Sequence, residues 1–277
     1  MEYGRFRAMG SDISWWGTRD LSRDLEDLFE RVEACCSRFR DDSELTRIND
    51  ALALSVPISP LMAEMLETAD RAYQLSEGRV DPTVLAAVRA AGYDRDLNSA
   101  SKKSRGSRTV PGWDSVSLDD NSVRRPPGVG IDLGGIAKGW TARAALEVPG
   151  ARLVDAAGDI AARGRWVVDV KHGGDRVAGL TVEDCGVATS GIDRRRWADG
   201  HHLIDPATGS PAVTDVLAAT VVAEDLRVAE TVARSVVLMG AWHGLGWAES
   251  LPEVRGALVT TTEGMTLSFP RTQEVLS

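Results

Sequence analysis

The sequence has few of the residues that build disulfide frameworks, metal clusters or membrane spans. It contains three cysteines and four histidines, and neither type recurs at a spacing typical of metal ligands. An odd, small number of cysteines fits a reducing cytosol. No apolar run approaches the roughly 20 residues that a membrane-spanning helix needs, and the first ten residues lack the apolar centre of a secretion signal. These absences predict a cytoplasmic protein without membrane insertion.

Basic residues are in the minority. The 32 lysines and arginines are outnumbered by 41 aspartates and glutamates, which gives a net charge of −9. This balance argues against nucleic-acid binding, because such binding needs a basic surface. A basic, serine-rich stretch at residues 97–109 is expected to be a flexible surface loop.

Hydrophobic residues make up 43% of the 277 positions, which is enough for a sizeable core. Apolar residues spaced three and four apart predict helices over residues 21–39, 60–77, 138–147 and 225–238. Asp42 or Ser43 can cap a further short helix. Strands are predicted over residues 5–17, 116–118, 129–131, 153–155, 166–170, 177–182, 187–189 and 218–223, with a closing hairpin at 254–268. Because helices and hairpins mix without a regular βαβ alternation, the pattern favours an α+β fold.

The most distinctive stretch is IDLGGIAKGW at residues 131–140. It predicts a strand end, a tight turn on Gly134 and Gly135, and a helix start that carries Lys138. Paired glycines bring backbone N–H groups close to a ligand, and a helix N-terminus beside a lysine suits an anion such as a phosphate. The spacing matches neither a Walker loop nor a Rossmann fingerprint. A strand–turn–helix with a purely structural role is the alternative at this point.

Small-residue turns recur at residues 78–83, 156–160 and 189–191. Together with the glycine turn they could hold a nucleotide through backbone N–H groups and hydroxyls. His202, close to Asp205, is a candidate general base, and its alternative role is to satisfy a turn. The sequence contains no Gly-x-Ser-x-Gly and no His-Glu-x-x-His motif, so hydrolase and zincin functions lack support.

Taken in order, these pieces resemble the FAD:protein FMN transferase (ApbE) family. The matching segments are residues 9–11, 39–49, 78–83, 132–139, 157–160, 189–191, 202–209 and 229–240, which span nearly the whole chain. The resemblance implies a single α+β domain over residues 1–277, with T-fold-like mixed sheets, flanking helices and a bent FAD in a cleft between two halves. It also implies Mg²⁺-assisted transfer of FMN from FAD to a Ser or Thr hydroxyl of a target flavoprotein, with release of AMP.

The resemblance assigns a role to individual residues of this sequence. The implied FAD contacts come from Met9, Phe39, Arg79, Val80, Asp81, Asp132, Lys138, Thr189, Ser190 and Ile204. His202 would be the catalytic base that activates the acceptor hydroxyl. The backbone of Gly135 and the side chain of Glu230 would face the metal.

The chain departs from the family pattern on its last long helix. The family typically places a metal-ligating Asp there, with a ligating Thr four residues later, whereas this chain has Glu230 and Arg234. Glutamate can ligate Mg²⁺, but a guanidinium cannot. Three interpretations stay open: an ordinary ion pair between the two residues, a weakened Mg²⁺ site, or an Arg234 side chain that replaces the metal on the pyrophosphate. The alternative function is accordingly an FAD-binding protein or a weak FAD pyrophosphatase without transfer activity.

Overall fold

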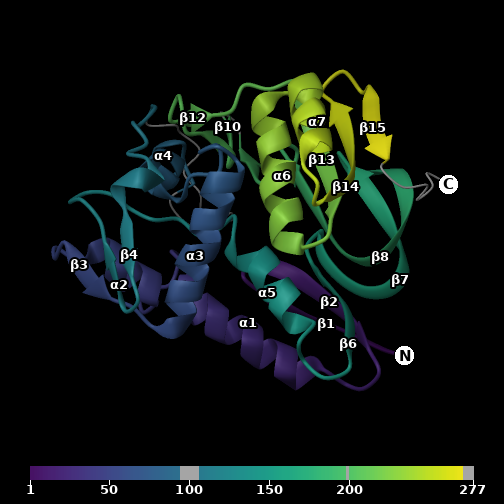
Figure 1. Ribbon diagram of the computed structural model, residues 1–277, viewed down its shortest axis with the longest axis horizontal. Helices are drawn as coiled ribbons and strands as arrows, with labels where there is room; N and C mark the ends of the chain where they lie inside the picture. The colour runs from purple at the N-terminus through teal and green to yellow at the C-terminus, as the bar shows by residue number, and fades with distance from the viewer. Residues whose placement is uncertain (94–105, 198–199, 271–277) are drawn as a thin grey trace. The chain divides into compact units, whose positions relative to one another are not determined.

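The chain is described by a computed structural model over residues 1–93, 106–197 and 200–270 (Figure 1). It divides into two compact units. The first consists of Met1–Leu28, Lys138–Arg194 and Val213–Ser277, and the second of Phe29–Ala137 and Arg195–Ala212. Most of the loop predicted at residues 97–109 lies outside the described residues.

The first unit is built on an eight-stranded antiparallel sheet of order β1-β2-β6-β7-β8-β13-β14-β15. These strands cover, in the same order, Glu2–Ala8, Ser11–Gly17, Ala151–Ala156, Asp159–His172, Asp175–Gly191, Val216–Ala223, Val254–Thr261 and Thr266–Pro270. Successive strands of the sheet are neighbours, so the sheet is a meander. The segments of the second unit are inserted between β2 and β6 and between β8 and β13.

Two helices pack against this sheet (Figure 1). Helix α6 (Leu226–Met239) contacts β8 and β13, and α7 (Ala241–Ser250) contacts β14. The apolar stripe of α6, which includes the fully buried Leu226 and Val232, faces the core. Gly186 of β8 permits the close approach, because a Cβ there would overlap the backbone of Leu226.

The second unit is mainly helical. It contains the end of α1 (Ser22–Cys36), followed by α2 (Glu44–Asp50), α3 (Pro60–Leu75) and α4 (Leu85–Ala90). A small antiparallel sheet of order β3-β5-β4 is formed by Ser55–Pro57, Ser122–Arg124 and Ser117–Asp119. Two short ladders pair β9 (Arg196–Trp197) with β10 (Gly200–His201) and β11 (Ile204–Asp205) with β12 (Ser210–Pro211). Helix α5 (Ala137–Ala145) leads the chain back into the first unit.

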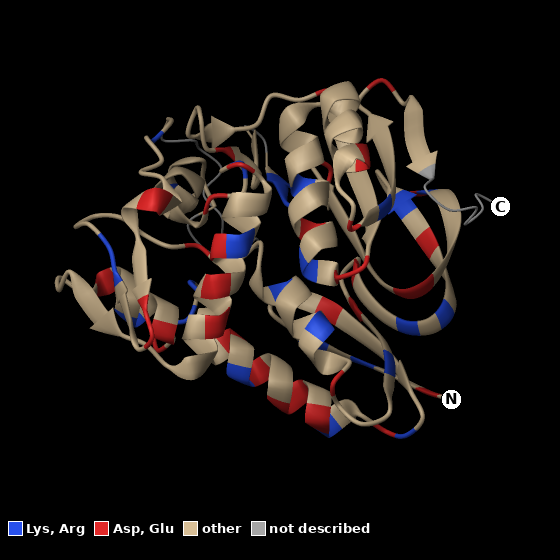
Figure 2. Cartoon of the chain, viewed as in Figure 1, with Lys and Arg blue, Asp and Glu red and all other residues tan. Residues whose placement is uncertain are grey.

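The long helices are amphipathic rather than uniformly apolar. Figure 2 shows acidic and basic positions interleaved along α1, whereas Leu25, Phe29 and Val32 of the same helix are fully buried. Within the described residues, no helix is both long and apolar enough to cross a membrane.

The structure confirms the α+β fold and the main helices predicted from hydrophobic spacing. Several predicted strands differ. Those predicted over residues 177–182 and 187–189 are parts of one strand, β8. The strand predicted over residues 5–17 is a hairpin, because Met9 and Gly10 both adopt positive φ, at 50° and 65°. The strand predicted over residues 129–131 is wrong, because the backbone of Ile131 bonds the side chain of Asn49 instead of a neighbouring strand. Helix α7 was not predicted, since two glycines interrupt its short apolar pattern.

Candidate functional site

The glycine turn of the second unit is held by groups from two distant parts of its sequence and by its own Asp132. The side-chain amide of Asn49 donates to the carbonyl of Ile131, and its oxygen accepts from the N–H of the same residue, both at 2.8 Å. The N–H of Asp132 donates to the carbonyl of Pro82 at 2.8 Å. The carboxylate of Asp132 accepts from the N–H of Gly134 at 2.7 Å. The turn is therefore shaped by the protein itself and leads directly into α5.

Glycine at position 134 lets the carboxylate of Asp132 approach the backbone closely. A Cβ at that position would lie 2.9 Å from Oδ1 of Asp132, the oxygen that accepts the N–H of Gly134. The prediction of a tight turn at this position followed by a helix is confirmed, since α5 begins at Ala137.

Asp132 uses its second carboxylate oxygen in a buried ion pair. Nε of Arg38 lies 2.9 Å from Oδ2 of Asp132, and the two side chains are only 4% and 11% exposed. Sequence reasoning missed Arg38, because it is far from its partner along the chain. Both oxygens of Asp132 thus have partners inside the second unit.

Asp81 also stabilises the turn on which it lies. Its Oδ1 accepts from both the N–H and the hydroxyl of Thr83 at 2.7 Å, and the Thr83 hydroxyl accepts from the N–H of Gly112 at 3.1 Å. Burial raises the pKa of Asp81, and the bonds from Thr83 oppose that rise. The neighbouring Val80 is buried, whereas Arg79 is paired with Glu77 at 3.0 Å on a partly exposed surface.

Phe39 belongs to an aromatic group in the second unit. Its ring is 45% exposed and packs edge-on against Tyr93 with 5.5 Å between centroids. Tyr93 in turn stacks on Trp197 at 5.9 Å. A half-exposed ring backed by a buried tyrosine and a partly buried tryptophan is suited to stack on the base or flavin of a ligand.

Two adjacent histidines have different environments. His201 is buried, its Nδ1 accepts from the N–H of Leu203, and its Nε2 donates to the carbonyl of Ala212 at 3.0 Å. Burial lowers the pKa of His201, so this ring is neutral. His201 therefore bonds the backbone of this turn, which was the alternative role for His202. His202 is half-buried between β10 and β11, and Ile204 beyond it is buried in an apolar cluster.

In the first unit, Lys138 forms a buried ion pair. Its Nζ lies 2.7 Å from Oδ2 of Asp159, and the two side chains are 13% and 8% exposed. Asp159 follows the turn at Ala157 and Gly158, both at positive φ, whose backbone is fixed by the carboxylate of Asp155. The charge of Lys138 is therefore placed beside a second small-residue turn, where it is partly neutralised by Asp159.

A buried histidine supports Thr189. The hydroxyls of Thr189 and Thr220 are 2.8 Å apart. Nε2 of His172 lies 2.9 Å from the Thr220 hydroxyl, and its Nδ1 lies 2.7 Å from that of Thr260. Burial lowers the pKa of His172 to about 4, so it is neutral at physiological pH. The sequence pattern gave no signal for His172, because the pairing of strands β7, β8, β13 and β14 creates this network.

The remaining predicted residues of the first unit lie on strands and at a turn. Ser190 follows Thr189 on β8 and is half-buried. Met9 is half-buried at the positive-φ turn between β1 and β2, where its carbonyl accepts from the hydroxyl of Ser11 at 3.5 Å.

Helix α6 carries the residues expected near a metal. The side chain of Glu230 is buried against the start of α5, where a Cβ on Gly139 would collide with Oε2 of Glu230. Nε of Arg234 is buried and has no hydrogen-bond partner within the described part of the chain. That part of the chain also holds no group of three or more His, Cys, Asp or Glu side chains arranged for a metal ion. Because Mg²⁺ requires oxygen ligands and Arg234 supplies none, these side chains do not fit the expected Mg²⁺ ligand pair.

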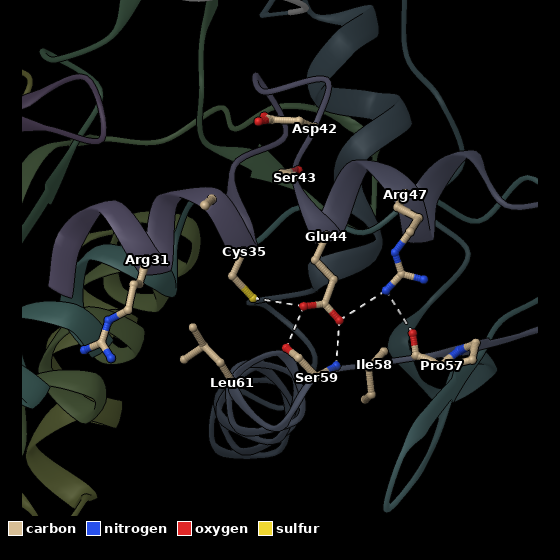
Figure 3. Close-up of a pocket in the computed structure, with 11 residues that line it drawn as sticks. Arg31, Cys35, Asp42, Ser43, Glu44, Arg47, Pro57, Ile58, Ser59 and Leu61 are labelled. Atoms are coloured by element: carbon tan, nitrogen blue, oxygen red, sulfur yellow. Dashed lines mark hydrogen bonds and ion pairs between the residues drawn. The ribbon is translucent and has the colours of Figure 1, made fainter. Parts of the chain in front are cut away.

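The second unit has a surface pocket of about 700 Å³, and the polar residues in it stabilise the fold (Figure 3). Glu44 at its base accepts from the N–H and hydroxyl of Ser59, both at 2.6 Å, and from the thiol of Cys35 at 3.6 Å. Ser59 caps α3, so Glu44 fixes the start of that helix. None of the residues that line the pocket is among the predicted FAD contacts.

Together, the fold and these turns define an α+β protein in which each unit carries a small-residue turn secured by a buried ion pair. Turns of this kind present backbone N–H groups to phosphate-bearing ligands. The model of the ApbE family matches residues 9–258, and the chain belongs to that family.

Relatives and solved structures agree with this assignment. The chain is 27% identical to an FAD:protein FMN transferase of Vibrio cholerae over 84% of this chain and 77% of the relative. It is 30% identical to one of Treponema pallidum over 78% of this chain and 71% of the relative. Among crystal structures, the ApbE protein of Thermotoga maritima superposes with a TM-score of 0.83 at 23% identity, covering 96% of each chain. The flavin transferase ApbE of Vibrio cholerae gives 0.79 at 24% identity, covering 97% of each chain. The structural likenesses establish the shared fold.

Proposed function

We propose that this protein is a flavin transferase that moves FMN from FAD to a Ser or Thr hydroxyl of a target flavoprotein and releases AMP. The observation that carries the proposal is the family match over residues 9–258. The curated relatives named above carry the name FAD:protein FMN transferase and align over most of their own length. The turn at residues 132–135 adds support, because its shape is fixed by bonds within the protein and it leads directly into the start of α5, where an anion is favoured.

FAD is the proposed substrate, and the residues that the family resemblance assigns to it are its proposed contacts. Phe39 would stack on a ring system, and Arg79, Val80 and Ile204 would shape the walls of its site in the second unit. Asp81 and Asp132 would act through the turns that they stabilise. In the first unit, Met9, Lys138, Thr189 and Ser190 would contact FAD. We further propose that the two units function as one transferase domain over residues 1–277.

The proposed reaction is a displacement at the phosphorus of the FMN half of FAD. The acceptor hydroxyl oxygen attacks this phosphorus, a new P–O ester bond forms, and the P–O bond to AMP breaks. His202 is the proposed base that takes the hydroxyl proton, and AMP leaves with the bridging oxygen. His202 suits this role better than His201, because both ring nitrogens of His201 are engaged by the backbone.

Mg²⁺ was expected from the family resemblance, with Gly135 and Glu230 as ligands. Arg234 stands at the second side-chain position and cannot ligate a cation, so the proposed reaction depends on groups of the chain itself. We propose that buried basic side chains of the chain supply the positive charge that faces the pyrophosphate. Activity that persists after divalent cations are removed would support this.

A target in the cytoplasm is proposed, because a small, odd number of cysteines fits a reducing compartment. The acceptor would be a flavoprotein that presents a Ser or Thr hydroxyl. The net charge of −9 argues against a nucleic-acid partner.

The proposal is tested by incubating the purified protein with FAD and a peptide that carries one acceptor threonine, with and without EDTA. A matched peptide with alanine at that position controls for other sites. An FMN phosphoester on the threonine peptide, together with equimolar AMP, supports transfer. AMP without labelled peptide would instead indicate hydrolysis, and bound FAD without AMP would indicate a binding protein.

A further inference from the structure

Arg38 is placed to control the charge of the glycine turn. Its guanidinium contacts two rings, with Cζ 4.1 Å from the centroid of Phe39 and 4.7 Å from that of Tyr93. Nη2 donates to the carbonyl of Tyr93 at 2.8 Å, and Nε binds Asp132 at 2.9 Å. With a side chain only 4% exposed, Arg38 is fixed on several sides and cannot easily leave Asp132.

Asp132 needs Arg38 as its partner, because its turn is proposed to bind a pyrophosphate. Its Oδ1 fixes the N–H of Gly134, so the carboxylate is an integral part of the turn. An unpaired carboxylate at this buried position would repel a pyrophosphate, and little solvent is present to screen it. Arg38 cancels this charge and also holds the carboxylate in the orientation that closes the turn.

We propose that Arg38 is a positioning residue for FAD binding, which acts by neutralising and orienting Asp132 so that the turn at residues 132–135 accepts the pyrophosphate. The inference rests on the proposed function, which supplies FAD as the ligand. It links the aromatic group around Phe39 to the phosphate-binding turn through a single side chain. Because lysine has one nitrogen in place of the guanidinium fork, it cannot bind both Asp132 and Tyr93 while also contacting both rings.

The test compares the binding of FAD, ADP and adenosine in a double-mutant cycle. The variants are Arg38→Met, Asp132→Asn, the double variant and Arg38→Lys. Affinities are measured by calorimetry or FAD fluorescence at a temperature at which circular dichroism shows each variant to be folded. The amide introduced by Asp132→Asn keeps an oxygen for the N–H of Gly134, so the turn can still close. Adenosine is the matched control ligand, since it lacks the pyrophosphate.

Arg38→Met is expected to weaken FAD and ADP binding about tenfold, while adenosine binding changes by less than about twofold. In the Asp132→Asn background the same substitution is expected to cost less than about threefold, because the repelling charge is gone. Arg38→Lys is expected to restore part of the lost affinity. These results would support the proposal.

Other outcomes would overturn it. A tenfold loss that persists in the Asp132→Asn background would mean that Arg38 contacts the ligand itself. An equal loss of adenosine binding would mean a general structural role, and unchanged FAD affinity in Arg38→Met would mean no role in binding. Because the readout is affinity, a protein that binds FAD without labelling a peptide would refute the transferase function while leaving the role of Arg38 testable.

Discussion

Lowering the pH should destabilise the first unit through His172. Its ring is 2% exposed and held between the hydroxyls of Thr220 and Thr260. Burial lowers its pKa from 6.5 to about 4 in the folded protein. Between these two values the unfolded chain binds the proton and the folded chain does not, so the free energy of unfolding falls as the pH falls from about 6.5 towards about 4.

The magnitude follows from the size of this shift. Each unit of pKa difference corresponds to about 1.4 kcal/mol. Between about pH 7 and about pH 4.5, the full shift would remove about 2.4 kcal/mol. Allowing for partial solvent screening, we expect the contribution of His172 to be about 2 kcal/mol.

Urea unfolding of the wild type and of His172→Gln at pH 7, 6, 5 and 4.5 measures this contribution. Glutamine can still bond a threonine hydroxyl but does not titrate, so the wild type should lose about 2 kcal/mol more than the variant over this range. Other titrating groups, including the buried His201, are present in both proteins and cancel. His243→Gln, which removes an exposed histidine, is the matched control. Parallel profiles for the wild type and His172→Gln would refute the reasoning.

Three further predictions concern the site. Gly139→Ala should lower the free energy of unfolding by about 1–3 kcal/mol, because its Cβ would collide with Oε2 of Glu230. Chemical denaturation should show a smaller loss in a Glu230→Ala background, and an equal loss there would contradict the stated contact. Arg234→Thr should make FAD binding respond to Mg²⁺, since it introduces a hydroxyl oxygen and removes a cation. Titration calorimetry with and without EDTA measures this. An FAD affinity that does not depend on Mg²⁺ in either the wild type or the variant would argue against any role of this position in metal binding. His202→Ala should lower peptide labelling by a factor of at least about 100 while FAD affinity changes little, as measured by mass spectrometry and fluorescence; parallel loss of both would make His202 a ligand-holding residue.

The sequence predicts those features that depend on local physical chemistry. The glycine turn at residues 132–135, the capped start of α3 and the apolar stripe of α6 all follow from short-range spacing. The order of the motifs also leads to the ApbE family, which the family match bears out. The individual site residues stay predictions, although the structure shows which bonds each side chain makes.

The features that the sequence could not predict depend on contacts between distant segments. Arg38 and Asp132 meet only because the segment after α1 and the glycine turn belong to one folded unit. His172 gains its partners only through the register of three other strands. Residues 129–131 have the composition of a strand, but the side chain of Asn49 takes the hydrogen bonds of Ile131 that a neighbouring strand would need.

The mass of an acceptor peptide after incubation with FAD tests the central claim most directly. We predict that the threonine peptide gains one FMN phosphoester, that equimolar AMP appears, and that the alanine peptide and the His202→Ala enzyme give neither product. A threonine peptide of unchanged mass in the presence of FAD-saturated wild-type protein would contradict the assignment as a flavin transferase.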